Sequence, residues 1–227
     1  MKKLVPFIAA AAVLGAWPAA SNAASFSGVV VARQGGVALV AARSGAVQAF
    51  HARARVGDRV VARGSGLAIV GRARSAHIRG IVVRRSGGRE FITAAHRILM
   101  VHTGSRRLAA TSDTAPQPGA VVSTTVNVNP TGELDEQNEQ EVGQAQNVQV
   151  QATISAVGPG TVTLTVNGQM LTVPLPAGLT LPTSVVGQTV TLNLSFSNGQ
   201  VTAEDNDDQG DDDQGDDDNH DGGGDGD

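Results

Sequence analysis

Apolar and polar residues alternate along most of the chain between residues 25 and 203, and Val and Thr are prominent among them. A period of two is typical of strands with one buried face, and branched residues favour strands. In TVTLTVNGQMLTV, Asn167 and Gly168 separate two such runs, which is a strong signal for a tight hairpin turn. The pattern therefore predicts an all-β fold.

The strand pattern recurs three times along the chain. SGVVVARQGG at 27–36 matches RGIVVRRSGG at 79–88 without a gap, and QATISAVGPG at 151–160 is a more distant copy. Each copy leads through a glycine-containing turn into a second strand, and VGDRV, PGAVV or VGQTV and a final hairpin follow. Internal repeats of this kind indicate one structural unit present three times. Five short strands in about 50 residues fit a small OB-like barrel, and a three-unit β-sandwich is the alternative.

These observations divide the chain into six segments. They are a signal peptide at 1–23, β-unit 1 at 25–75, β-unit 2 at 76–132 with a long loop at 103–118, a polar linker at 133–148, β-unit 3 at 149–203 and a disordered acidic tail at 204–227. Units this small, with cores rich in Ala and Val, bury little apolar surface, so each alone is expected to be marginally stable. We therefore expect units 1 and 2 to pack together.

The first residues have the features of an export signal. Lys2 and Lys3 precede an apolar run, and the small residues Ser21 and Ala23 precede a predicted cleavage site before Ala24. The sequence contains no cysteine, so neither a lipid-modified cysteine nor a disulfide is available. The sequence predicts an exported protein of the periplasm, the cell envelope or the extracellular space. It predicts no lipoprotein anchor, and no transmembrane segment after cleavage.

Charge is divided between the two halves of the chain. Residues 24–110 carry 15 arginines and two acids, a formal charge of +13, whereas residues 111–227 carry 19 acids and no Lys or Arg. An arginine-rich surface can bind polyanions, and the candidate residues are Arg53, Arg55, Arg84 and Arg85. Because the acidic tail is tethered to the same chain, we expect it to compete for this surface and mask it at low salt.

The tail also contains one pattern that is typical of a metal site. DDNHDGGGD at 217–225 places Asp217, Asn219 and Asp221 at positions 1, 3 and 5 of a calcium loop, and Asp225 at position 9. The sequence ends before position 12, where such a loop has a bidentate glutamate. An ordered calcium site, diffuse binding of divalent cations and a merely solvated tail all remain open.

Motifs for catalysis or for cofactor binding are absent from the sequence. It has no GxSxG nucleophile elbow and no phosphate-binding glycine loop that opens a helix. The four aromatic residues after residue 23, Phe26, Phe50, Phe91 and Phe196, occupy apolar strand positions and so offer no platform for stacking bases. We predict neither an enzyme nor a cofactor-dependent protein, and no specific binding of nucleic acid.

The order of G-x-V-V, a glycine-rich turn, VG-x-x-V and a closing hairpin resembles a family of small exported bacterial β-modules. That family is catalogued as a domain of unknown function that occurs in tandem behind a signal peptide. The resemblance is clearest over residues 150–203 and weaker over 25–75, while unit 2 departs from it at Pro118 and in its longer loop. It implies OB-like barrels and an envelope or extracellular setting, and it supplies no catalytic residues.

Together these features predict an exported, non-enzymatic binding or scaffold protein with an unknown envelope or extracellular ligand. Calcium or another divalent cation bound by the tail, and a polyanion bound by units 1 and 2, are the alternatives.

Overall fold

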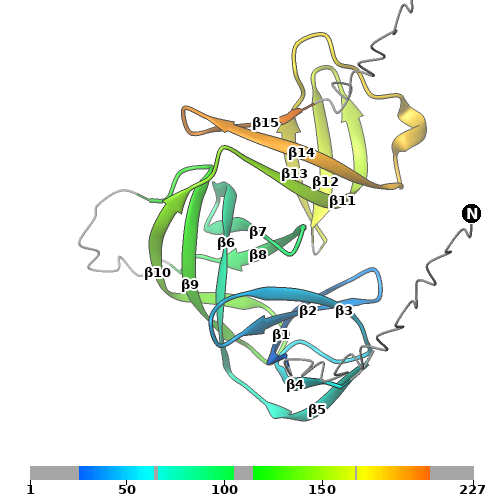
Figure 1. The fold of residues 1–227 in the computed structure, drawn as a ribbon. Helices are drawn as coiled ribbons and strands as arrows, with labels where there is room; N and C mark the ends of the chain where they lie inside the picture. The colour runs from blue at the N-terminus through cyan, green and yellow to red at the C-terminus, as the bar shows by residue number, and fades with distance from the viewer. Residues whose placement is uncertain (1–25, 64–65, 105–114, 167, 205–227) are drawn as a thin grey trace, which may run out of the picture.

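The computed structural model describes residues 26–63, 66–104, 115–166 and 168–204. In these residues the chain forms fifteen strands and one short 3-10 helix, arranged as three successive five-stranded units with unit 2 in the middle (Figure 1). The predicted signal peptide, the tail beyond Glu204 and most of the loop at 103–118 lie outside the described residues. No helix in the described ranges is long and apolar enough to cross a membrane.

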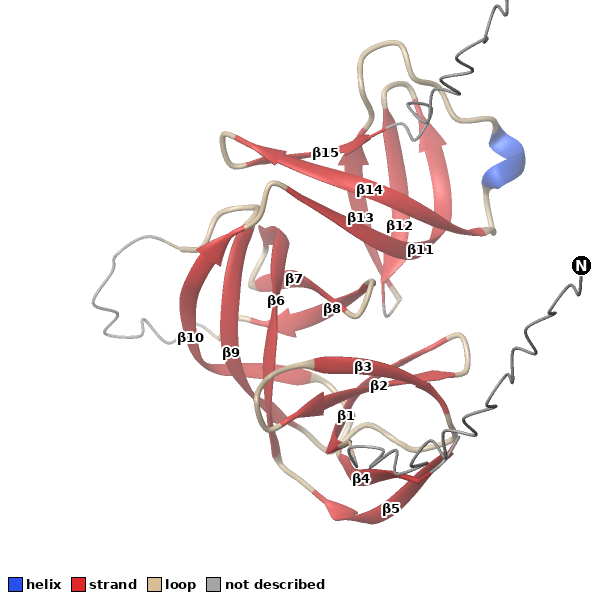
Figure 2. Ribbon diagram, viewed as in Figure 1, coloured by secondary structure: helices blue, strands red, loops and turns tan. Residues whose placement is uncertain are grey.

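Each unit contributes five consecutive strands to the fold, which consists almost entirely of strands and turns (Figure 2). Unit 1 contains β1 (Ser27–Gln34), β2 (Val37–Ala42), β3 (Val47–His51), β4 (Asp58–Arg63) and β5 (Gly66–Arg72). Unit 2 contains β6 (Ser75–Ser86), β7 (Arg89–Ala94), β8 (Arg97–His102), β9 (Ala120–Val128) and β10 (Leu134–Gln144). Unit 3 contains β11 (Asn147–Gly158), β12 (Thr161–Val166), β13 (Gln169–Pro174), the 3-10 helix (Thr183–Val185), β14 (Thr189–Ser197) and β15 (Gln200–Glu204).

All three units have the same strand order. The first strand is central, the second and third strands extend the sheet on one side, and the fourth and fifth extend it on the other. In unit 2 the fifth strand also meets the third in parallel, at Asp135 and His102, so this sheet closes into a barrel. Five strands in this Greek-key order form an OB-like fold. The predicted all-β fold of tandem OB-like units is confirmed, and the β-sandwich alternative is not adopted.

The repeated sequence places a β-bulge at the same position of the first strand in every unit. The register between the first two strands shifts across Val31 in unit 1, Val83 in unit 2 and Ser155 in unit 3. A bulge bends its strand and changes the direction of the side chain that it carries. The equivalence of these three positions therefore shows that the sequence repeat encodes a repeated backbone feature.

The bulge residue and a neighbour on the second strand join each unit to the next one. Val31 and Leu39 of unit 1 belong to the buried cluster that fills the interior of unit 2. Val83 and Phe91, their equivalents in unit 2, belong to the cluster that fills unit 3. The interior of unit 1 forms a separate cluster. The expected packing of unit 1 against unit 2 is confirmed, and unit 3 packs against unit 2 in the same way.

In unit 3 the equivalent pair is polar. Ser155 and Thr163 occupy these positions, and the Ser155 hydroxyl donates a hydrogen bond to the Thr163 carbonyl at 3.1 Å. Unit 3 therefore presents no apolar pair at the place where units 1 and 2 each contact their neighbour. In stacked repeats a polar outer face is typical of a terminal unit.

The glycine of the G-x-V-V repeat is required by the close approach of two strands. A Cβ atom at Gly28 would overlap the Ala41 carbonyl, and a Cβ atom at Gly80 would overlap the Thr93 carbonyl. Only glycine removes this overlap without moving the second strand.

The polar linker predicted at 133–148 is wrong for most of its length. Leu134–Gln144 forms β10, which pairs with β9 and completes the barrel of unit 2, so that unit ends at Gln144 and not at residue 132. Two register shifts bend β10, which lets its start reach β8. The sequence pattern did not predict this strand, because glutamates occupy inward positions where apolar residues are usual. The side chains of Glu136 and Glu139 are 5% and 6% exposed.

The shared core between units 2 and 3 leads to a stability prediction. Phe91 is 5% exposed, and replacing a buried phenylalanine with alanine costs about 3–5 kcal/mol. We expect Phe91→Ala to lower the unfolding temperature by several degrees and to separate the unfolding of unit 3 from that of units 1 and 2 in calorimetry. Met170→Ala is the control, because Met170 is 75% exposed and surface changes usually cost less than about 0.5 kcal/mol. An unshifted single transition for Phe91→Ala would contradict the shared core.

Candidate functional site

Three grooves at the seams between units are each lined by two arginines. The unit 1–2 groove has a volume of about 600 Å³, the junction groove, where all three units meet, about 340 Å³, and the unit 2–3 groove about 200 Å³. Arg43 and Arg59 line the unit 1–2 groove. Arg33 and Arg97 line the junction groove, and Arg84 and Arg89 line the unit 2–3 groove.

The unit 1–2 groove runs between β1 and β4 of unit 1 and the start of β6 in unit 2. Its wall includes apolar side chains such as Val29 and Val61, beside the two arginines. His77 also lines it, and the Ser123 hydroxyl lies 3.0 Å from Nε2 of this ring. This groove therefore offers cationic groups beside an apolar surface.

The junction groove brings together side chains from all three units. Arg33 lies near the end of β1 and Arg97 at the start of β8, while unit 3 contributes hydroxyls at Thr153, Thr165 and Thr189. The position is held by a contact between units, since the Gln34 amide donates a hydrogen bond to the Ile98 carbonyl at 2.7 Å. The groove combines two cations with several neutral hydrogen-bonding groups.

The arginines of the unit 2–3 groove already contact unit 3. Arg84 donates a hydrogen bond to the Thr172 carbonyl at 3.0 Å, and Arg89 donates one to the Gln169 side-chain oxygen at 2.9 Å. Both acceptors are neutral, so these bonds position the guanidinium groups without balancing their charge.

The charge of the three grooves is not balanced by their walls. No Asp or Glu is among the described residues that line them. Arginine presents a planar fork of donors that matches carboxylate, sulfate and phosphate groups. Each groove is therefore suited to an anionic group.

The four arginines predicted to bind a polyanion do not form one surface. Arg53 and Arg55 are exposed on the segment between β3 and β4. Arg84 lies in the unit 2–3 groove, whereas Arg85 points into unit 2 and contacts glutamates. Adjacent residues in a strand face opposite sides, and the bulge at Val83 sets which side each takes: Arg84 lies opposite Phe91 and Arg85 opposite Glu90.

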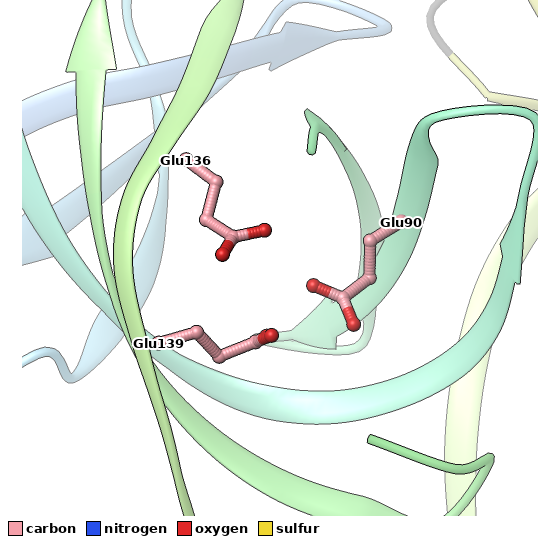
Figure 3. A group of neighbouring side chains, drawn as sticks. All are labelled: Glu90, Glu136 and Glu139. Atoms are coloured by element: carbon pink, nitrogen blue, oxygen red, sulfur yellow. The ribbon is translucent and has the colours of Figure 1, made fainter. Parts of the chain in front are cut away.

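Inside unit 2, three glutamates converge on Arg85. Glu90 comes from β7 and Glu136 and Glu139 come from β10, and Figure 3 shows their carboxyl groups pointing toward one another. One carboxylate oxygen of each lies within 4.8 Å of the others. The Arg85 guanidinium lies 3.3 Å from Glu139, 3.5 Å from Glu136 and 3.9 Å from Glu90. The Thr124 hydroxyl on β9 donates a hydrogen bond to Glu139 at 3.4 Å. We call these three glutamates the carboxylate cluster.

Burial changes the ionisation of the carboxylate cluster. Desolvation, followed by interaction with Glu139, raises the pKa of Glu90 to about 9. Burial, followed by the charge of Glu139, also raises the pKa of Glu136. Without a bound cation, this raised pKa favours the neutral form of Glu90 at neutral pH.

Sequence reasoning missed the carboxylate cluster because two of its members lay in the presumed linker. The third, Glu90, is one of only two acids in residues 24–110, which also hold 15 arginines, so it contributed to the net charge of this half without indicating a site. The repeat contained a usable signal, because the second arm of the final hairpin is the fifth strand of units 1 and 3. Applied to unit 2, that rule places Glu136 and Glu139 on a strand beside the barrel.

The calcium loop predicted at Asp217, Asn219, Asp221 and Asp225 lies outside the described residues, so it stays a prediction. The same holds for masking of the arginines by the acidic tail.

No family model matches the sequence, and no curated protein matches it at a significant level. Among solved structures, a multidomain protein with nucleic acid binding domains from Streptococcus pneumoniae is similar at 11% identity and a TM-score of 0.24, over 80% of this chain and 73% of that chain. A structure described as Drosophila Unr CSD456 is similar at 13% identity and a TM-score of 0.23, over 79% of this chain and 94% of that chain.

The protonated Glu90 leads to a prediction about pH. Its pKa is raised from 4.5 to about 9 by folding, so the folded state holds a proton that the unfolded chain releases between these values. The contribution of Glu90 to the stability of the fold should therefore be fully present below about pH 4.5 and be lost as pH rises toward about 9, by at most about 1.4 kcal/mol per pH unit. We expect Glu90→Gln, which stays neutral, to flatten this decline and to raise the unfolding temperature at pH 8.

Thermal unfolding between pH 5 and pH 9 measures the effect. Glu141→Gln is the control, because Glu141 is exposed on the same strand as Glu136 and Glu139. A wild-type protein whose unfolding temperature is constant over this range, or a Glu90→Gln variant with the same decline, would contradict a protonated Glu90.

Proposed function

We propose that the chain is an exported, non-enzymatic binding protein that holds an anionic polymer of the bacterial envelope or extracellular space in the grooves between its OB-like units. The observation that carries the proposal is that each of the three grooves presents two arginines and no acid among its described lining residues. A polymer with repeated acidic groups can contact more than one groove, and several modest contacts on one chain then add to its affinity.

The kind of anion follows from the aromatic residues. Single-stranded nucleic acids bind to OB folds largely through bases stacked on aromatic side chains. Phe91 is buried between units 2 and 3, and the other three phenylalanines are partly buried: Phe26 and Phe50 contact each other at 5.5 Å between ring centroids, and Phe196 packs against the cluster of unit 3. This arrangement favours an acidic glycan or another polymer recognised by its charge and hydroxyl groups.

The export of the protein is part of the proposal and rests on residues 1–23. The charged start, the apolar run and the small residues before Ala24 support a cleaved signal peptide. An exported protein meets the acidic polymers of the envelope, which agrees with the chemistry of the grooves.

The junction groove provides the sharpest test of binding. We expect the double variant Arg33→Gln with Arg97→Gln to weaken binding to heparin by about 10-fold or more, because charge-assisted hydrogen bonds contribute about 1.5–3 kcal/mol each. The matched control is Arg53→Gln with Arg55→Gln, which removes the same charge from an exposed segment and should change binding by about 2-fold. Retention in a salt gradient and titration calorimetry both measure the difference.

An equal loss in the two double variants would mean that only net charge matters and would overturn binding in the grooves. Oligo(dT) of equal charge serves as a second ligand. Tighter binding of oligo(dT) than of heparin would overturn the assignment to an acidic glycan.

Masking by the acidic tail is a separate part of the proposal. Residues 205–227 hold 12 acids and no Lys or Arg, and such a segment extends at most about 80 Å. Because each exposed ion pair contributes under about 1 kcal/mol, masking needs many pairs and low salt. We expect a chain that ends at Glu204 to be retained more strongly on a heparin column at low salt than the full chain. Unchanged retention, with or without calcium, would show that the tail does not mask the grooves.

A further inference from the structure

The carboxylate cluster in unit 2 has more negative charge than its arginine can balance. With all three glutamates ionised, the formal charge is −3, and Arg85 contributes +1. The remaining charge of −2 lies among side chains that are between 0% and 6% exposed. Unbalanced charge in a buried position is costly, so it calls for protons or for a cation.

Glu90 is a buried group without a hydrogen-bonding partner. It is 0% exposed, and neither of its carboxylate oxygens has a hydrogen-bond partner. The side chain points toward Glu136 and Glu139 (Figure 3). Apart from the 3.9 Å ion-pair contact between Arg85 and Oε1, these oxygens have no polar contact that the structure shows in the described residues. Buried polar atoms are nearly always satisfied, so two such oxygens aimed into a carboxylate cluster point to a ligand that the glutamates share.

Arg85 contacts only one oxygen of each glutamate, so the second oxygen can take part in binding a ligand. It contacts Oε1 of Glu90, Oε2 of Glu136 and Oε2 of Glu139. The other oxygens are Oε2 of Glu90, Oε1 of Glu136, and Oε1 of Glu139, which accepts the bond from Thr124. Arg85 is itself 28% exposed, so it lies toward solvent while the glutamates lie deeper.

The donor set and its spacing identify the ligand. The three glutamates supply only oxygen, which suits hard cations and not zinc or copper. One oxygen of each glutamate lies within 4.8 Å of the others, so the three can approach a single ion. Calcium accepts flexible shells of oxygen ligands, whereas magnesium demands a near-octahedral shell and usually keeps several waters, so a buried set of three carboxylates favours calcium.

We propose that unit 2 binds one calcium ion between Glu90, Glu136 and Glu139. The ion brings the formal charge of the cluster and Arg85 to zero. It also joins β7 to β10, the strand that closes the barrel against β8. This site is distinct from the grooves and from the tail pattern at 217–225.

Calcium-dependent stability of the full chain without its signal peptide tests the site. A ligand that binds only the folded protein raises its unfolding temperature, whereas diffuse binding by the acidic tail acts on folded and unfolded chains alike. At pH 8, we expect saturating calcium to raise the unfolding temperature by about 5 °C or more, and magnesium at the same concentration to have a much smaller effect.

Two cluster variants and two controls separate this site from other sources of binding. Glu90→Gln and Glu139→Gln should both lose the calcium response. The unfolding temperature of each variant is also measured without calcium, so that loss of the response is separated from a failure to fold. Glu141→Gln, on the exposed face of β10, and the tail variant Asp217→Asn with Asp221→Asn should both keep the response.

The following results would overturn the proposal. One is an unfolding temperature of the wild type that does not change up to about 10 mM calcium, which would mean that protons alone balance the charge of the carboxylate cluster. Another is an equal shift in Glu90→Gln, or loss of the shift in the tail variant. An equal shift with magnesium would overturn the assignment to calcium.

Discussion

The rest of the structure depends on one interaction between neighbouring units. In units 1 and 2, an apolar residue at the bulge and one on the second strand pack into the interior of the next unit. A bulge in the first strand turns Val31 of unit 1 toward unit 2, and the equivalent Val83 of unit 2 toward unit 3. Small cores rich in alanine and valine gain from this arrangement, because the neighbour's side chains complete them. In unit 3 the same position is Ser155, whose hydroxyl makes a hydrogen bond within the unit in place of the apolar contact with a neighbour.

Stacking the units in this way also creates the grooves. Each groove lies beside a seam, where the curved sheets of two units meet but cannot fill all the space between them. The arginines at these seams come from different strands, and some of them use neutral groups of the next unit as hydrogen-bond acceptors. The seams therefore combine the contacts that join the units with a concentration of positive charge, and this charge is the basis of the proposed binding of an anionic polymer.

Unit 2 differs from its neighbours in the way it closes. Its fifth strand is long, carries two bulges and reaches the third strand, and it brings two glutamates into the interior. Arg85 meets them from the first strand of the unit. The equivalent residue is Arg33 in unit 1, which lies opposite Ala38, and Val157 in unit 3. Only in unit 2 does the strand after the bulge carry a guanidinium opposite a buried glutamate. A polar interior and a closed barrel thus occur together in the middle unit.

The sequence by itself determined the strands, the hairpin turns, the three-fold repeat and the OB-like class, because alternation and turn chemistry act over a few residues. It also divided the charge between the two halves of the chain. Only the tertiary structure decided which arginines line a groove, because that depends on a bulge that sends Arg84 to one face of β6 and Arg85 to the other. The same holds for the carboxylate cluster, whose ion pairs join residues 51 and 54 positions apart. These residues meet only because β10 bends and closes the barrel against β8, which depends on the packing of all five strands. A local sequence pattern does not contain that information.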